Sequence, residues 1–524
     1  MNVEKLATRI FCVLCGILMA ILFYNSMCAS WINEQTWNEL VTERSDNLWF
    51  NVLGILLGIA LSWIVATLVS KCATDKGMHV AAIVIGILCT AVSAYWVYAM
   101  QTGPEADQRD IVEYAKAYAL GDTTSLLKGG YVANYPQQLG LITFMRVLFL
   151  IFGQGNYKAY QYFNACMVFL IVYSGYQIVR YLTGKHVKAE AIYLLFMILC
   201  VPMYGYAPFI YGEIASIALM LAATWTFLSI IRRFRWWKLV ILAILSGGMV
   251  QFRKNALICV IAFLVVLVVK FVRRPQKELG LTGAAVLAGV IGFQMVISAI
   301  YAPYMGEDAE PIPTLLYVAM GTHYSPDIGA GWHDGYDLGM YRTCGFDPEI
   351  AKEAAKQDIR EFVEKCKADP RQLFLFYDMK INSQWNAPMY QCIVMNSSFY
   401  DAPKKIAQQI CFLGGDRYLE SFMEIYQLLI YGGALLFLIW KCKKAERIEN
   451  VVLMICVYGG FLFSVLWEAK TRYVFPYFMM MIPCAVAGIA ESMTRLSSKI
   501  KRRKKPNQLI TVKWHPRLVN LVHM

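Results

Sequence analysis

The amino-acid sequence predicts an all-α polytopic membrane protein with about twelve transmembrane helices, a helix on the outer surface and a small, mainly helical extracytoplasmic subdomain. Of its 524 residues, 58% are hydrophobic and 16% are charged, whereas soluble domains average about 45–50% apolar and about 25% charged residues. The apolar residues form continuous blocks of roughly 20 residues, the length that a helix needs to cross a hydrocarbon core. Because these blocks do not alternate with polar residues, they predict helices and not the strands of a barrel.

Twelve such blocks follow one another along the chain as candidate spans. They lie near residues 7–28, 48–70, 79–100, 158–180, 187–207, 210–231, 236–251, 254–272, 279–301, 423–440, 450–467 and 473–492. The first block follows Lys5 and Arg9 as a signal peptide would, but its length and the topology favour an uncleaved span. The block at 137–152 is short, contains Arg146 and follows Pro136, so we expect it to lie on or dip into the outer leaflet.

Charge alternates between the turns that connect these spans. If the N-terminus is cytoplasmic, the turns on the same side are basic and contain Lys71, Lys76, Arg180, Lys185, Lys188, Arg232, Arg233, Arg235, Lys238, Arg273, Arg274, Lys277, Lys441, Lys443 and Lys444. This pattern follows the positive-inside rule and predicts a multi-pass protein of the cell membrane with both termini cytoplasmic. The net charge of +13 then serves to anchor the topology against anionic membrane lipids, and we expect no nucleic acid partner.

The spans divide the chain into four parts. We expect an N-terminal transmembrane module over 1–301, with its first external loop at 101–157, and an extracytoplasmic subdomain over 302–422. C-terminal transmembrane helices over 423–492 and a basic cytoplasmic tail over 493–524 follow.

Local signals refine the extracytoplasmic subdomain. Asp347-Pro348 and Asp369-Pro370 each join an N-cap residue to a proline at the first helical position, which predicts two helices. Most of the fifteen cysteines lie in apolar blocks and act there as small hydrophobes. Four lie in the polar segment, where an extracytoplasmic location would permit disulfides that the sequence leaves open: Cys344, Cys366, Cys392 and Cys411.

Polar residues that suit chemistry gather at the outer ends of the spans. Few ionisable residues lie within the spans, whereas proton- or ion-coupled transporters usually need them there. Glu105 and Asp107 stand two apart after the third span and would face one cavity if the backbone is extended. Such a pair can accept a proton from a hydroxyl or hold a divalent cation. The alternative is that these acids only mark an outer loop and the start of the next helix.

Several short motifs resemble those of the GT-C glycosyltransferases, the superfamily that includes protein O-mannosyltransferases and the aminoarabinose transferases of lipid A. The motifs are Asp107-Gln108, Gly121-Asp122, Gly129-Gly130-Tyr131, Tyr135-Pro136-Gln137-Gln138 and Glu468-Ala469-Lys470-Thr471-Arg472-Tyr473. They span nearly the whole chain but are sparse. The proline-rich signature of the O-mannosyltransferases is replaced by Tyr135-Pro136-Gln137-Gln138, which argues against protein O-mannosylation.

The resemblance implies a function and roles for individual residues. Bacterial members of the superfamily transfer sugars from a polyprenyl phosphate, so the implied partners are a polyprenyl-phosphate-linked sugar, a cell-envelope acceptor and membrane lipids. Asp107 matches the catalytic base or acceptor-orienting group of the first external loop, with Glu105 as its neighbour and Gln108 in support. Glu213 occupies the place of a second acidic residue. Its alternative role is a charge at a helix N-terminus.

A lipid phosphate as leaving group requires cations at the outer boundary of the membrane. The candidates are Arg253, Lys254, Lys380 and Arg472, all expected on the outer side against the usual charge bias. For the arginines the alternative is snorkelling of a long side chain. Glu468 is placed to orient Arg472 across one helical turn, beside Tyr473.

Two further outer residues and the rival functions complete the prediction. Trp332 is a candidate for stacking on a sugar ring, and His323 lies in the same loop without the spacing of a zinc site. No metal site is predicted, although a divalent cation remains a possible cofactor. The alternatives to a glycosyltransferase are a polysaccharide polymerase or ligase, a flippase or other transporter of lipid-linked glycans, and a non-catalytic scaffold.

Overall fold

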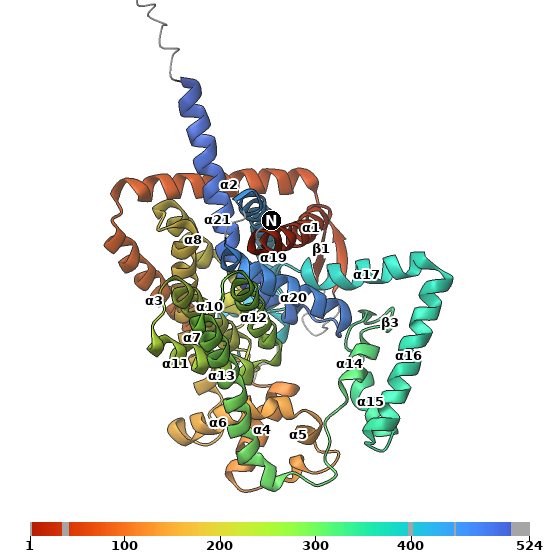
Figure 1. Cartoon of the computed structure of the whole chain (residues 1–524). Helices are drawn as coiled ribbons and strands as arrows, with labels where there is room; N and C mark the ends of the chain where they lie inside the picture. The colour runs from red at the N-terminus through yellow and green to blue at the C-terminus, as the bar shows by residue number, and fades with distance from the viewer. Residues whose placement is uncertain (1–2, 34–40, 397–401, 445–446, 505–524) are drawn as a thin grey trace, which may run out of the picture.

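The computed structural model describes residues 3–33, 41–396, 402–444 and 447–504, and this part of the chain is almost entirely helical (Figure 1). The first half comprises α1 (Val3–Cys28), a hairpin of β1 (Ala29–Ile32) and β2 (Thr42–Ser45), α2 (Leu48–Cys72), α3 (Asp75–Met100), α4 (Asp107–Ala119), α5 (Tyr131–Asn134), α6 (Leu139–Phe152), α7 (Lys158–Thr183), α8 (Val187–Leu199), α9 (Val201–Gly205), α10 (Glu213–Arg232), α11 (Trp236–Phe252), α12 (Leu257–Arg273) and α13 (Lys277–Tyr301). The second half comprises α14 (Thr314–Met320), β3 (Tyr324–Ser325), β4 (Gly329–Ala330), α15 (Tyr336–Thr343), α16 (Pro348–Ala368), α17 (Pro370–Trp385), α18 (Lys405–Phe412), α19 (Gly415–Lys444), α20 (Val452–Leu466) and α21 (Thr471–Lys504).

Ten helices in the described residues are long and apolar enough to cross a membrane, which supports an all-α, multi-pass membrane protein. The described residues thus hold ten such helices, or eleven if the bent pair Thr124–Asn134 and Pro136–Phe152 forms one span, where about twelve spans were predicted. The block predicted at 187–207 is interrupted at Cys200, and Pro202 is the second residue of the short helix α9 that follows. The block at 236–251 forms α11, a helix of 17 residues that falls just short. The block at 137–152 forms α6, which meets the preceding segment at a bend of 96°.

The charged turns separate into two groups at opposite ends of the long helices. At one end the carboxylate of Glu4 forms ion pairs with Lys270 and Arg273, so the start of α1 lies beside the end of α12. Arg180, at the end of α7, likewise pairs with Asp75 at the start of α3. These contacts bring together turns that the charge alternation places on one side.

At the other end, Arg44 of the β1–β2 hairpin pairs with Glu420 and Glu424 near the start of α19. The predicted outer loops thus also contact one another. The basic tail predicted from residue 493 continues α21 as far as Lys504, and the rest of it lies outside the described residues.

Helix α21 lies at the centre of the bundle and packs against α19, α20, α8 and α7. A side chain on Gly488 would meet the backbone oxygen of Gly433 at 2.1 Å, and one on Gly433 would meet the oxygen of Ala485 at 2.8 Å. Small residues therefore let α19 and α21 approach at backbone distance, as helices in membranes commonly do. This close packing holds the middle of α21 against α19, and the first turn of α21 carries residues of the candidate site.

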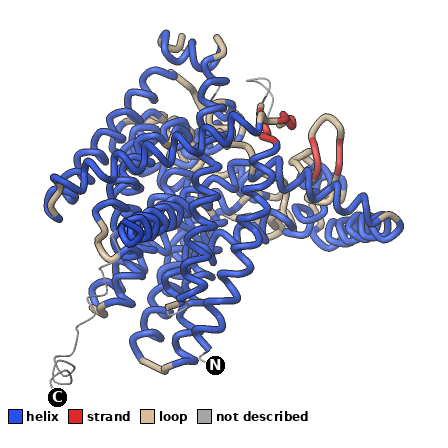
Figure 2. The backbone as a smooth tube through the Cα atoms, turned by 90° about the horizontal axis from the view of Figure 1, so that it is seen from above, coloured by secondary structure: helices blue, strands red, loops and turns tan. Residues whose placement is uncertain are grey.

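The segment 302–422 is only partly a separate subdomain. Ile312, Leu316, Tyr341 and Ala351 belong to a small core of its own, and α16 with α17 forms an arm to one side of the bundle (Figures 1 and 2). The residues that follow Trp385, by contrast, are buried in the main core.

Both helices predicted from the Asp-Pro pairs are confirmed. Asp347 caps α16 by accepting from the backbone N–H of Glu349, and Asp369 caps α17 by accepting from that of Arg371. The cysteines of this segment do not form the disulfides that were left open, because all fifteen cysteines of the chain are free thiols.

Candidate functional site

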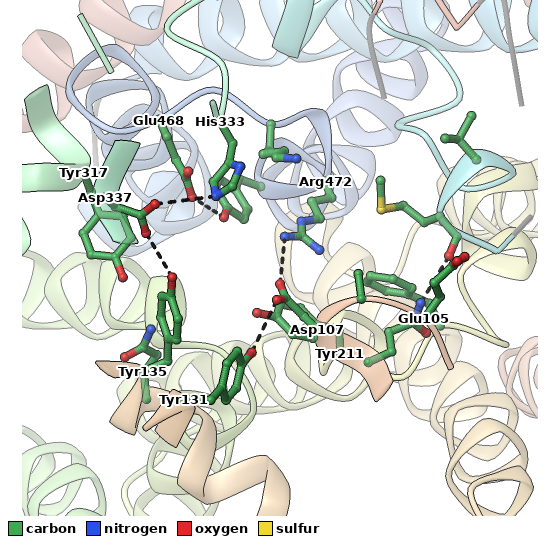
Figure 3. A pocket seen from close by; sticks show the side chains of 18 residues that line it. Glu105, Asp107, Tyr131, Tyr135, Tyr211, Tyr317, His333, Asp337, Glu468 and Arg472 are labelled. Carbon is green, nitrogen blue, oxygen red and sulfur yellow. Dashed lines mark hydrogen bonds and ion pairs between the residues drawn. The ribbon is translucent and has the colours of Figure 1, made fainter. Parts of the chain in front are cut away.

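A cavity of about 510 Å³ opens where the predicted outer loops meet, at the ends of the long helices. Segments from distant parts of the sequence line it, and the close-up in Figure 3 shows their side chains pointing toward one another. Its lining residues include Glu105, Asp107, Gln108, Tyr131, Tyr135, Gln137, Phe209, Tyr211, Tyr317, His333, Asp337, Glu468, Lys470, Arg472 and Tyr473. Many of the residues predicted for the site are thus gathered in one place.

An unusual backbone turn brings both acids of the first loop to the cavity. Ala106, between Glu105 and Asp107, has φ 47° and ψ −131° and precedes the first residue of α4. A residue with a Cβ rarely adopts this conformation, and such strain tends to occur at functional sites. The expectation that both acids line one cavity is met, but the extended backbone assumed for it was wrong. Helix α4 begins at Asp107 itself.

Asp107 is an accessible acid of the cavity with a cationic and a hydroxyl neighbour. Its side chain is 42% exposed, and its Oδ2 lies 3.9 Å from a guanidinium nitrogen of Arg472. The hydroxyl of Tyr131 donates to Oδ1 at 3.3 Å. A carboxylate with one lone-pair direction open to a cavity and a charge partner beside it suits acceptance of a proton.

Two arginines lie against the same pair of aromatic rings. The guanidinium carbon of Arg472 is 4.9 Å from the ring centre of Tyr211 and 5.5 Å from that of Tyr473. Arg253 makes the same two contacts at the same distances. Stacking on aromatic faces fixes a guanidinium plane and leaves its edge free to bind. Arg472 lines the cavity, whereas Arg253 does not.

Glu213 explains why Arg253 is held back from the cavity. It is the first residue of α10, is only 1% exposed, and its Oε1 lies 3.5 Å from the Arg253 guanidinium. No side chain in the described residues donates a hydrogen bond to either carboxylate oxygen. Glu213 does not line the cavity, so it is not placed there as a second acidic residue. The alternative prediction, a charge at a helix N-terminus, agrees with its position as the first residue of α10, where it is also the counter-ion of Arg253.

Glu468 does not pair with Arg472 across a helical turn as predicted. Helix α21 begins at Thr471, so Glu468 belongs to the loop that precedes it. Its carboxylate accepts a hydrogen bond from the Tyr473 hydroxyl at 2.6 Å instead. Gln108 also holds the wall together, because its amide oxygen accepts from the backbone N–H of Ile210 at 2.8 Å.

A further acidic residue faces the cavity from the outer segment and was missed from the sequence. Asp337 accepts a hydrogen bond from Tyr135 at 3.3 Å and lies 3.8 Å from His333 (Figure 3). Tyr317 lines the same wall and stacks on the ring of Trp467. Neither residue stands in a recognisable motif, because tertiary packing alone brings α14 and α15 against the first loop.

Two predicted phosphate ligands lie away from the cavity. The ammonium of Lys254 donates to the side chain of Gln294 at 2.7 Å. Lys380 is completely buried and donates to the backbone oxygens of Gly321 at 2.6 Å and Val465 at 3.1 Å. Burial lowers the pKa of Lys380 to about 7, against a weaker opposing effect of Glu468. Lys380 therefore ties the end of α14 to the end of α20, and we leave both lysines out of the proposed phosphate site.

Contacts with neighbouring segments also fix the position of Trp332. Its indole N–H donates to Ser383 at 2.9 Å, and its backbone forms a parallel bridge with Ala469. The ring is buried and lies outside the cavity lining, so it is not placed to stack on a sugar there. His323 pairs with Asp334 at 2.9 Å and faces a separate outer cavity of about 880 Å³.

In the described residues, no group of three or more His, Cys, Asp or Glu side chains is arranged to hold a metal ion. Comparison with models of known families, with curated proteins and with solved structures gives no match for this chain. Any account of the function must therefore start from the cavity and its chemistry.

Proposed function

We propose that this protein is a membrane glycosyltransferase that moves a sugar from a polyprenyl phosphate to an acceptor hydroxyl on the extracytoplasmic face. The observation that carries the proposal is the cavity in which Asp107 and Arg472 lie 3.9 Å apart among tyrosine side chains. A base and a stacked arginine in one cavity match the two charges that such a reaction moves: a proton from the acceptor and a negative charge on the departing phosphate.

In the proposed reaction the acceptor hydroxyl lies beside Asp107. The carboxylate takes its proton as the acceptor oxygen forms a bond to the anomeric carbon. On the opposite face of the sugar the bond between that carbon and the phosphate oxygen breaks, and the electron pair leaves with the lipid phosphate. The guanidinium of Arg472 offers paired N–H donors to that phosphate. Attack opposite to departure inverts the configuration at the anomeric carbon.

The walls of the cavity suit a sugar. Tyr131, Tyr135, Tyr211 and Tyr317 all line it, and aromatic rings bury the apolar faces of a sugar while their hydroxyl groups hydrogen-bond. The cavity also lies at helix ends, because Arg472 is the second residue of α21 and Tyr211 precedes α10. A substrate whose lipid chain stays in the bilayer can therefore reach it with its phosphate and sugar.

Orientation follows from charge. The helix ends opposite the cavity carry the basic turns, such as those with Arg180 and Arg273. The positive-inside rule then assigns that end, with the start of α1, to the cytoplasm and the cavity to the extracytoplasmic face.

The deciding experiment compares a deletion strain complemented with the wild-type chain, with Asp107→Asn and with Glu113→Gln. Glu113 lies on the same helix, pairs with Lys116 on the surface and does not line the cavity, so it controls for loss of an acid. We expect Asp107→Asn to accumulate lipid-linked sugar and lose the glycan product, with membrane insertion unchanged. Near-normal product from Asp107→Asn would reject the proposal, and product retained on the cytoplasmic side would indicate a flippase instead.

A further inference from the structure

A second cavity, lined mainly by basic side chains, lies at the end of the bundle opposite the candidate site. It has a volume of about 530 Å³ and lies among the ends of α1, α7, α10 and α12 and the turn before α20. Four cationic side chains and two carboxylates line it: Arg232, Lys270, Arg273, Arg447, Glu4 and Glu449. A neighbouring cavity of about 230 Å³ shares Arg232 and adds Arg180 and Lys185 without any acid in its lining.

The two carboxylates are already occupied by partners within the protein. Glu4 is almost fully buried and pairs with Lys270 and Arg273, and it also accepts from the backbone N–H of Ile448. Glu449 pairs with Lys270 at 2.9 Å. These contacts hold the two helix ends and the turn in place, so the cavity has a fixed frame.

Arg232 and Arg447 remain as the cations that the frame does not use. In the described residues neither forms an ion pair with a carboxylate, yet both face the cavity. An arginine presents paired N–H donors that fit the oxygens of a phosphate. Two arginines are thus available to bind an anion, in a cavity whose lining has more cations than carboxylates.

The helices whose ends line the cavity also expose apolar side chains along their outer surfaces, which favours a lipid as the source of the phosphate. Val268 and Val272 of α12 are each 60% exposed, and Ile10 of α1 is 48% exposed. Such surfaces at the helix ends are what the acyl chains of a bilayer cover. A phosphate that enters between the helix ends can therefore have its chains along α1 and α12.

We propose that this cavity binds the headgroup of an anionic phospholipid through Arg232 and Arg447. The site is independent of the proposed transferase activity and lies at the other end of the helices. A bound lipid would contact both Arg232 at the end of α10 and Arg447 in the turn before α20. The ion pairs of Glu4 and Glu449 do not involve Arg232 and so do not join these two elements. Basic pockets between membrane helices are a recurrent way of recognising such headgroups.

The test uses the full chain purified in a neutral detergent. Phosphatidylglycerol, cardiolipin, phosphatidylcholine and inorganic phosphate are added separately, and the melting temperature and the lipid retained in native mass spectra are measured. A ligand that binds only the folded state raises the melting temperature with concentration. We expect stabilisation by the two anionic lipids and none by phosphatidylcholine.

Variants locate the site. Arg232→Gln with Arg447→Gln should weaken binding, so that the concentration of anionic lipid needed for half saturation rises at least tenfold. Arg233→Gln with Arg235→Gln removes the same charge from exposed arginines outside both cavities and should behave as wild type. Arg232→Lys with Arg447→Lys should recover part of the affinity, which separates loss of the site from misfolding.

Three results would overturn the proposal. Equal lipid responses of the two double glutamine variants would show that the effect is general charge attraction. Equal stabilisation by phosphatidylcholine would remove the need for an anionic headgroup. Full stabilisation by inorganic phosphate would reject the lipid as the source of the bound group.

Discussion

The guanidinium of Arg472 lies 3.9 Å from the carboxylate of Asp107, although Asp107 follows the third long helix and Arg472 starts the last. The separation is longer than a hydrogen bond, so the two groups attract each other without closing the cavity between them. A ligand phosphate or an acceptor hydroxyl can therefore reach either group. Four predictions follow from this arrangement and its supports.

Replacing Arg472 by alanine should remove the phosphate ligand. Loss of one donor to a developing negative charge typically lowers the turnover number by about 10²–10³. We expect Arg472→Ala to accumulate the lipid-linked donor, measured by extraction and chromatography of lipid-linked sugars. Arg472→Lys keeps the charge but loses the planar fork, and should recover only part of the activity. Accumulation of the acceptor with normal donor turnover would assign Arg472 another role.

Replacing Tyr131 by phenylalanine should have a small and specific effect. Its hydroxyl donates to Asp107 at 3.3 Å, a long hydrogen bond. Hydrogen bonds to charged groups contribute about 1.5–3 kcal/mol, and this one is expected at the lower end of that range. The ring, which stacks on Tyr114, stays in place. Transfer should fall roughly tenfold, measured as product formed per minute in membranes with saturating donor. A loss as large as that of Asp107→Asn would mean that Tyr131 itself contacts the reacting atoms.

Removing the charge of Glu213 should destabilise the protein more than it alters the cavity. Glu213→Gln leaves Arg253 buried without its counter-ion, and breaking a buried pair in this way typically costs about 3–5 kcal/mol. Glu213→Gln with Arg253→Met removes both charges and should recover much of the lost melting temperature. Thermal unfolding of the two single variants and the double variant forms the cycle. Additive losses would show that the two side chains do not depend on each other.

Lys380 should make stability depend on pH. Burial lowers its pKa to about 7 in the folded protein, whereas a lysine in an unfolded chain has a pKa near 10.4. Between these values the unfolded state binds more protons, so the contribution of Lys380 to stability rises with pH. A neutral amine still has two N–H donors for the oxygens of Gly321 and Val465.

The comparison with Lys380→Met isolates this effect. The variant leaves two buried carbonyl oxygens without donors, which costs about 1–3 kcal/mol for each. Its deficit in stability relative to wild type should grow between pH 7 and pH 9, measured by thermal unfolding in detergent. A deficit that is constant or shrinks over this range would contradict the lowered pKa. Lys352→Met, at an exposed lysine on α16, should show no such trend.

The sequence predicts the membrane class well, because continuous apolar blocks and basic turns report directly on the surrounding solvent. It also predicts Asp107 and Arg472 as site residues, because both lie in the recognised motifs and Arg472 is a basic residue on the outer side, against the usual charge bias. It does not predict Asp337, whose role depends on how α15 packs against the first loop. Nor does it distinguish Lys380 from a phosphate ligand, because only tertiary structure shows that its ammonium is bonded to two backbone oxygens.

Helix boundaries are a second feature that the sequence does not predict. Hydropathy measures the composition of the block at 187–207, but the regular helix α8 ends at Leu199 and a new short helix that contains Pro202 follows. Likewise, the pairing expected between Glu468 and Arg472 assumed a continuous helix across residues 468–472. The chain enters the helix only at Thr471, and no periodicity in so short a motif reports that boundary.

The position of α21 also bears on the order in which the protein is made. Asp107 is made early in synthesis, whereas Arg472 and Tyr473 come from the last long helix, and Ala469, which bridges to Trp332, comes from the loop just before it. A nascent chain therefore carries the acid of the first loop for most of its translation without the guanidinium that faces it. Ribosome-stalled chains that stop before residue 471 should insert their earlier helices and still have no functioning cavity, so that competence is acquired in a single late step.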